Sequence, residues 1–286
     1  MLSNKVSEIM TTNLTATPIS ASIFEVMERM STEDVGRIIV TDNEVPVGIF
    51  TERDVLRRVV NSDIDAKKTA VKEVMTSPIR AVREETHIVE AFGKMFRGKY
   101  RHLLVRGKRG RIVGIVSMRR ILKVAVELGQ GLIETATLGK LTMAGVDRVE
   151  DTVSIRDAIN VMVKKGASAV VIADGGRPEG IFTERDVLKR VATRNIDKHR
   201  TPVKEVMTAP LITMPDTALI GDALAEMYRR DIRNMPVRGD NQELVGLVSM
   251  SDVLQYARAF DIDEQVRRTW KEVAEYLDND DQYTPG

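Results

Sequence analysis

The sequence predicts a mixed α/β protein made of four copies of one small unit, because two nested repeats run along it and each copy shows the same order of strands and helices. The segment Gly48 to Leu56, GIFTERDVL, returns unchanged as Gly180 to Leu188. The same offset relates residues 71–78, VKEVMTSP, to residues 203–210, VKEVMTAP. The chain is therefore a duplicated half.

Each half divides again into two units. Hydroxyl residues that close a glycine-led apolar strand recur at equal intervals, at Thr51, Ser117, Thr183 and Ser249. The polar stretches 61–69 and 193–201 are predicted to be linkers between the units of a half. The four units are predicted at residues 6–62, 70–128, 137–194 and 202–258, and residues 259–286, with Trp270 and an acidic end, are predicted to form a C-terminal helix and tail.

The first unit shows how each element is predicted. Apolar residues recur at helical spacing over residues 22–30, and Ser20 or Ser22 can act as the N-cap. Two β-branched or apolar runs, 38–40 and 47–50, flank a polar turn and predict a hairpin.

A second helix is predicted to open at Thr51, with Val55, Leu56, Val59 and Val60 on one face. With a short strand in front, the unit reads β-α-β-β-α. A unit this small leaves apolar faces uncovered, so we expect it to pair with its neighbour.

Composition narrows the functional classes. The chain has 286 residues, 43% hydrophobic and 30% charged, without cysteine, and no apolar run or leader sequence suggests membrane insertion or export. We therefore expect a cytoplasmic protein. The three histidines lie far apart in sequence, so no metal site is expected.

The charge balance argues against a nucleic-acid-binding protein. A net charge of +1 provides no overall field for a polyanion. The densest basic stretch runs from Arg97 to Arg111; it fits a nucleic-acid patch, but a solvated strand and turn is the favoured interpretation.

The repeated hydroxyl residues are candidates for ligand binding. Each stands where a strand passes into a helix, so free amides and the positive end of the helix dipole face one spot. Three residues later come Asp54, Arg120, Asp186 and Asp252. A carboxylate there can accept hydrogen bonds from the vicinal hydroxyls of a ribose, but the same pattern is also a helix-capping box. Its recurrence, with basic residues on the preceding strand, favours binding.

These motifs resemble the cystathionine β-synthase (CBS) domain family. The resemblance rests on Gly48 to Asp54 and its three relatives and on unit openings such as Val74 to Pro78, and it covers residues from about Val6 to Arg258. It implies two tandem pairs of units that form a disc, with clefts for AMP, ADP, ATP or S-adenosylmethionine. The four-unit layout is similar to the gamma regulatory subunits of AMP-activated protein kinase, in which the second unit also carries arginine instead of aspartate, as at Arg120.

The resemblance also implies roles for individual residues. Ribose would be bound by three pairs: Thr51 with Asp54, Thr183 with Asp186, and Ser249 with Asp252. The second unit should lack normal ribose recognition, since Arg120 cannot accept a hydroxyl proton. Phosphate contacts are expected from Arg37, Arg101, His102, Arg119, Arg120, Ser168 and Arg233. Met10, Met75, Met143 and Met207 could line an adenine pocket, although core filling is the commoner role of methionine.

Taken together, the sequence predicts a non-catalytic sensor that binds an adenine nucleotide and passes its state to an effector protein, as a homodimer. Catalysis is not expected, because no cysteine, histidine cluster or additional domain is available for chemistry. Nucleic-acid binding and a purely structural scaffold remain alternatives.

Overall fold

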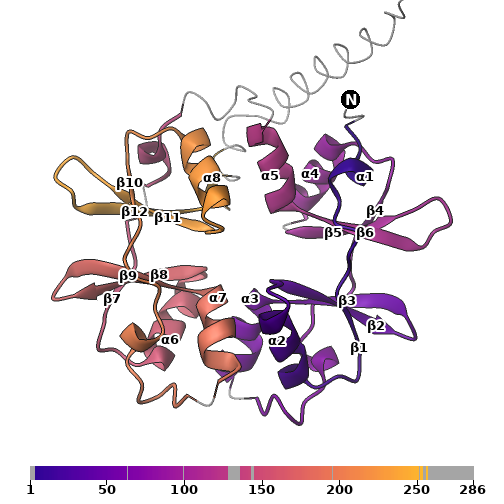
Figure 1. The fold of residues 1–286 in the computed structure, drawn as a ribbon, viewed down its shortest axis with the longest axis horizontal. Coiled ribbons are helices and arrows are strands. Elements are labelled where there is room, and N and C mark those ends of the chain that lie inside the picture. The colour runs from indigo at the N-terminus through magenta and orange to yellow at the C-terminus, as the bar shows by residue number, and fades with distance from the viewer. Residues whose placement is uncertain are drawn as a thin grey trace, which may run out of the picture.

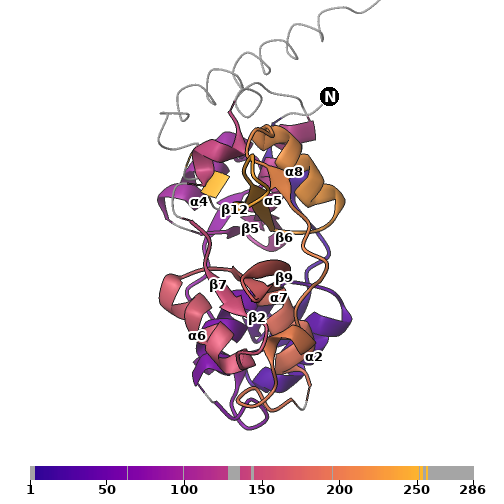
Figure 2. The ribbon, with the colours of Figure 1, turned by 90° about the vertical axis from the view of Figure 1, so that its left-hand side faces the viewer.

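The protein is described here from a computed structural model. The structure describes residues 4–62, 64–98, 100–127, 136–142, 145–194, 196–250, 252–253 and 256, with only the backbone of residues 124–127. The predicted tail at residues 259–286 lies outside these residues. Four similar units surround a common centre, and the edge-on view shows that the assembly is narrower in that direction, like a disc (Figures 1 and 2).

The first unit has the predicted order of elements. Strand β1 (Ala16–Pro18) is followed by helix α2 (Ile23–Thr32), strands β2 (Arg37–Asp42) and β3 (Val45–Thr51), and a short helix, α3 (Glu52–Asp54). Before β1 lies α1 (Val6–Ile9). β1 runs parallel to β2, and β2 runs antiparallel to β3.

The other units repeat this plan. Each has its own three-stranded sheet, in which the first strand is parallel and the third antiparallel to the second. The second unit contains β4 (Ala81–Arg83), α4 (Ile88–Arg97), β5 (His102–Arg106), β6 (Ile112–Ser117) and α5 (Met118–Glu127); the third contains β7 (Arg148–Glu150), α6 (Ile155–Lys165), β8 (Ala169–Asp174), β9 (Arg177–Thr183) and α7 (Glu184–Asp186); the fourth contains β10 (Met214–Pro215), α8 (Ile220–Arg229), β11 (Asn234–Arg238) and β12 (Leu244–Ser249).

Helix α2 begins where its sequence predicts. Ser22 is the N-cap: its hydroxyl accepts a hydrogen bond from the Glu25 amide, while the Glu25 carboxylate accepts one from the Ser22 amide. The linker 61–69 also contributes, because the amides of Ile23 and Phe24 donate to the carbonyls of Thr69 and Ala66. The linker thus satisfies helix-end donors that would otherwise lack partners.

The helix after Thr51 differs from the expected α-helix. After α3 the chain continues as a π-helix over Val55–Val59. The wider turn brings side chains four and five positions apart onto one face, and Val55, Leu56, Val59 and Val60 are all buried. A pattern of apolar residues alone does not distinguish these two helix types.

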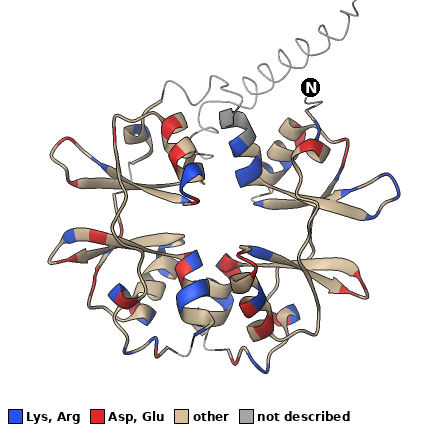
Figure 3. Ribbon diagram, viewed as in Figure 1, with Lys and Arg blue, Asp and Glu red and all other residues tan. Residues whose placement is uncertain are grey.

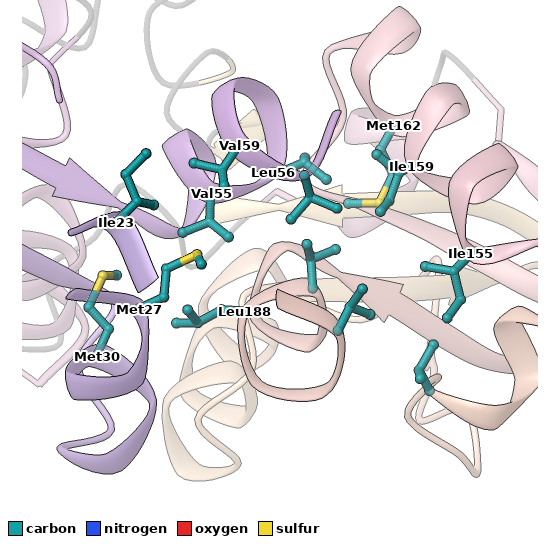
Figure 4. Packing of buried hydrophobic residues seen from close by; sticks show 14 of the residues in the cluster. Ile23, Met27, Met30, Val55, Leu56, Val59, Ile155, Ile159, Met162 and Leu188 are labelled. Atoms are coloured by element: carbon teal, nitrogen blue, oxygen red, sulfur yellow. The ribbon is translucent and has the colours of Figure 1, made fainter. Parts of the chain in front are cut away.

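The units pack against each other in two ways. The third unit has a π-helix of its own, Val187–Ala192, after α7. The π-helices of the first and third units, with α2 and α6, enclose one apolar core that includes Leu56, Ile159 and Leu188 (Figure 4). Helices α5 and α8 join the second unit to the fourth. The sheets of the first and second units meet through a smaller cluster formed by Ile39, Ile49, Leu104 and Ile115. The predicted pairing of neighbours is confirmed, and a second pairing between halves closes the ring.

Among the described residues, no helix combines the length and the apolarity that crossing a bilayer would require.

Candidate functional site

Asp186 lies where β9 passes into α7, and its carboxylate is almost fully hydrogen-bonded. Oδ2 accepts from the amide of Thr183 at 2.9 Å and from its hydroxyl at 2.7 Å. Oδ1 accepts from the Thr208 hydroxyl at 3.0 Å and lies 3.4 Å from the Arg190 guanidinium. Thr208 comes from the opening segment of the fourth unit, where it forms an antiparallel β-bridge with Ile181 of β9.

The other two aspartates show the same capping contacts. Asp54 Oδ2 accepts from the amide and hydroxyl of Thr51 at 2.9 and 2.7 Å, and Asp252 Oδ2 accepts from both groups of Ser249 at 2.7 Å. The capping interpretation of the motif is therefore correct in geometry. The motif can also bind a ligand, because a carboxylate oxygen has two lone pairs and the Oδ1 atoms of Asp54 and Asp186 take no part in the cap.

A cavity of about 480 Å³ opens beside Asp186 and reaches the centre of the disc. All four units contribute to its lining. Of the residues predicted to bind a ligand, the cavity is lined by Arg37, Arg101, His102, Arg119, Ser168, Thr183, Asp186, Arg233 and Ser249. The structure thus brings nine of the thirteen together around one space.

Four predicted residues do not line this cavity: Thr51, Asp54, Asp252 and Arg120. Arg120 lies at the start of α5, where its Nε donates to the carbonyl of Ile9 at 3.3 Å and its amide to the Ser117 hydroxyl at 3.2 Å. Its guanidinium is thus engaged at the packing of α1 on α5.

The lining is strongly basic. Among the described residues that face the cavity there are eight arginine and lysine side chains against three carboxylates. Figure 3 shows basic residues on α5, α3 and α7, with acidic residues beside them on α3 and α7. Burial lowers the pKa of Arg37, and the neighbouring positive charge of Arg233 adds to that effect. Such a lining favours an anionic ligand.

Arg37 stands out among these cations. It is the first residue of β2, facing Thr51 across the β2–β3 ladder. No hydrogen bond or ion pair engages its guanidinium within the part of the chain that the structure describes, whereas Arg101 and Arg233 pair with glutamates and Arg119 pairs with Asp231 at 2.6 Å. Its five donors are thus available to a ligand.

His102 is kept neutral by its surroundings. It begins β5 and lines the cavity, and burial lowers its pKa well below the usual 6.5, with Arg37, Arg101 and Arg233 adding repulsion. A neutral imidazole can donate one hydrogen bond and accept another. The equivalent position of the fourth unit is Asn234, whose amide oxygen accepts from the Ser168 hydroxyl at 2.8 Å.

Two glutamates that the sequence interpretation missed lie next to these arginines. Glu52 pairs with Arg233 and lies 3.5 Å from Arg185; Glu184 lies 3.3 Å from Arg53 and 3.9 Å from Arg101. Both belong to the repeated Thr-Glu-Arg-Asp segment, which occurs only in the first and third units. The sequence signal that could have revealed these glutamates is that the segment is identical in the first and third units and absent from the other two. A helix start that only faces solvent would not require glutamate at this position in both.

The methionines near the unit openings belong to the cores instead of this cavity. Met75 packs over Gly48 of β3 and Met207 over Gly180 of β9, and both contact the core shared by the first and third units. Met10 packs over Gly114 of β6. Met143 lies outside the described residues.

Comparisons with known proteins match this architecture. Over 285 residues the chain is 30% identical to CBS domain-containing protein CBSCBSPB1 of Arabidopsis thaliana, covering 85% of this chain and 51% of that protein. It is 25% identical to the meiotically up-regulated gene 70 protein of Schizosaccharomyces pombe, covering 85% and 41%. The chain thus spans about half the length, or less, of these curated relatives.

Among solved structures, protein MJ1225 of Methanocaldococcus jannaschii, proposed to be an archaeal homologue of g-AMPK, superposes with a TM-score of 0.75 at 18% identity, covering 88% of this chain and 99% of that one. At this identity the match concerns the fold. The CBS-domain family model matches residues 6–61, 71–127, 145–193 and 203–259. The chain therefore belongs to the CBS-domain family, with four CBS domains in tandem.

Proposed function

We propose that this protein is a non-catalytic regulatory protein or sensor that binds an adenine nucleotide in the cavity beside Asp186, which all four units line. One observation carries the proposal: a carboxylate at a strand-to-helix junction and a cluster of cations line the same cavity of about 480 Å³. That volume lies within the usual range of small-molecule sites, roughly 300 to 1,000 Å³.

The carboxylate and the cations of the lining suit the two polar parts of a nucleotide, the ribose and the phosphate. Asp186 accepts hydrogen bonds from ribose hydroxyls through Oδ1, next to Thr208. Arg37, Arg101 and Arg233 provide the guanidinium donors that phosphate oxygens require. Apolar side chains of the same lining, which include Ile181, Leu211, Ile212 and Met250, offer a surface for the purine.

The charge of the cavity also ranks the ligands considered from the sequence. AMP, ADP and ATP carry negative phosphates, whereas S-adenosylmethionine carries a positive sulfonium. With eight cations against three carboxylates around the described cavity, the lining favours the nucleotides. We rank AMP, ADP and ATP above S-adenosylmethionine on this ground.

Isothermal titration calorimetry tests the proposal. We expect AMP, ADP and ATP to bind with measurable heat and S-adenosylmethionine to bind at least about tenfold more weakly, as one lost charge-assisted hydrogen bond would produce. The absence of heat with all four ligands would overturn the proposal.

A sensor also needs a partner that reads the bound state. We propose an effector protein in that role and a homodimer as the working assembly. Light scattering on the peak eluted from a size-exclusion column tests the homodimer. We expect the mass of a dimer, and the mass of a monomer would overturn this part of the proposal.

A further inference from the structure

Two buried glutamates already occupy the arginines that a phosphate would need. The side chains of Glu52 and Glu184 are only 4% and 5% exposed. Glu52 pairs with Arg233, and Glu184 lies 3.9 Å from Arg101. The two arginines are 34% and 38% exposed and line the cavity, so that a ligand can approach them.

Each of these pairs joins the two halves of the chain. Glu52 and Arg101 belong to the first half, Glu184 and Arg233 to the second. The arrangement follows the internal duplication, whose single offset relates Glu52 to Glu184 and Arg101 to Arg233. The first half therefore binds an arginine of the second, and the second half binds the equivalent arginine of the first.

The ion pair between Glu52 and Arg233 needs a glycine at position 36, because a side chain there would collide with it. A Cβ atom added to Gly36 would lie 2.8 Å from an Arg233 guanidinium nitrogen and 3.1 Å from Glu52 Oε1. The Glu52 amide also donates to the Gly36 carbonyl at 3.2 Å. Gly36 lines the cavity, so the ion pair is held directly against its wall.

A carboxylate and a phosphate bind the same guanidinium donors in the same bidentate manner, and they repel each other. We propose that Glu52 and Glu184 are internal competitors, which the phosphate of a bound nucleotide displaces from Arg233 and Arg101. The proposal rests on the proposed function, because the nucleotide delivers the phosphate to this place. Phosphate binding then replaces contacts that join the two halves.

This exchange makes the cavity sensitive to the phosphate in particular. A nucleoside can fill the ribose and purine positions without disturbing either ion pair. A phosphate that binds Arg233 or Arg101 releases that arginine from its glutamate and leaves the carboxylate to Arg185 or Arg53, 3.5 and 3.3 Å away. By linkage, any partner that stabilises the ion pairs weakens phosphate binding to the same extent.

The variants Glu52→Gln and Glu184→Gln test the exchange by calorimetric titration with adenosine, AMP and inorganic pyrophosphate. We expect each variant to bind AMP and pyrophosphate about tenfold more tightly than the unchanged protein, because the competing charge is gone. Adenosine affinity should stay within about twofold. Glu33→Gln removes an exposed carboxylate paired with Arg29 and serves as the matched control, with no change expected.

Unchanged or weaker binding of both AMP and pyrophosphate in the two variants would overturn the exchange, since it would mean that the glutamates orient the arginines for the ligand. Failure of the proposed function looks different: the unchanged protein would then bind neither adenosine nor AMP, and pyrophosphate alone would report on the exchange. Circular dichroism checks folding. Should a glutamine variant fail to fold, Glu52→Asp is expected to show a smaller gain for pyrophosphate, and no gain there also overturns the exchange.

Discussion

The replacement Asp186→Asn separates ribose binding from helix capping. Asparagine has nearly the same shape as aspartate, and its amide oxygen can still accept from the Thr183 amide, which now lies 2.9 Å from Oδ2. The charge is lost, as is the second acceptor that Thr208 uses at 3.0 Å. We expect the free energy of unfolding to fall by about 1 kcal/mol, the usual net value of one hydrogen bond, because the bond from the Thr208 hydroxyl is lost while the capping bond is kept.

The effect on ligand binding should be larger and specific to the ribose. A hydrogen bond to a charged acceptor contributes about 1.5 to 3 kcal/mol, so AMP affinity at this cavity should fall roughly 10- to 150-fold. The 2′,3′-dideoxy analogue of AMP lacks the hydroxyls that Asp186 would bind. Its affinity should therefore be similar in the variant and in the unchanged protein.

Calorimetric titration of the unchanged protein and of Asp186→Asn, each with AMP and with dideoxy-AMP, measures the affinities. Urea denaturation measures the free energy of unfolding of both proteins. Unchanged AMP affinity together with reduced stability would show that Asp186 is a cap and nothing else. An equal fall in the affinities for AMP and dideoxy-AMP would show that the carboxylate does not contact the ribose hydroxyls.

Three further predictions concern single residues. The pKa of His102 in the folded protein is lower than the usual 6.5, so the unfolded chain takes up the proton first and the free energy of unfolding should fall as pH drops below 6.5. Urea denaturation across pH should show a smaller fall in His102→Asn, which introduces the residue found at position 234, and an equal fall would contradict this role of His102. Leu188→Ala should reduce the free energy of unfolding by about 2 to 5 kcal/mol, as Leu188 is 1% exposed in the core that joins the first and third units; a loss below about 1 kcal/mol in urea would show that this core does not hold the halves together. Gly180→Ala would place a Cβ 2.6 Å from Met207 Sδ and 2.8 Å from the Thr208 carbonyl oxygen, and should cost about 1 to 3 kcal/mol in thermal unfolding. An unchanged melting temperature would show that neither the Met207 side chain nor the Thr208 backbone is fixed against β9.

Much of the fold could be predicted because local signals and repeats agreed. The helix that begins after a serine N-cap, the hairpin β2–β3 and the strand-to-helix junction at Thr51 follow from short-range patterns that the structure confirms, and of the two candidate caps, Ser20 and Ser22, the structure selects Ser22. Because the sequence repeats between the halves and again within each half, a prediction made for one unit applies to all four. The π-helix at Val55–Val59 was missed, because its buried residues also fit an α-helix.

The candidate site was only partly predictable, for a physical reason. Asp186 and Thr183 lie close together in the sequence, so their contact is local, whereas Arg37, Arg101 and Arg233 come from three different units and meet only when these units close around one centre. Glu52 and Glu184 pair with Arg233 and Arg101, each of which lies in the opposite half of the chain. No periodicity within a unit determines which arginine a glutamate on another unit will meet.

A crystal structure of the protein, from crystals grown with AMP, tests most directly whether the cavity binds a nucleotide through Asp186 and the arginines. We expect density for the nucleotide in the cavity, with the ribose hydroxyls within hydrogen-bond distance of the Asp186 carboxylate and the phosphate between Arg233, Arg101 and Arg37. A cavity without nucleotide at millimolar AMP, or a nucleotide whose phosphate lies away from all three arginines, would contradict it.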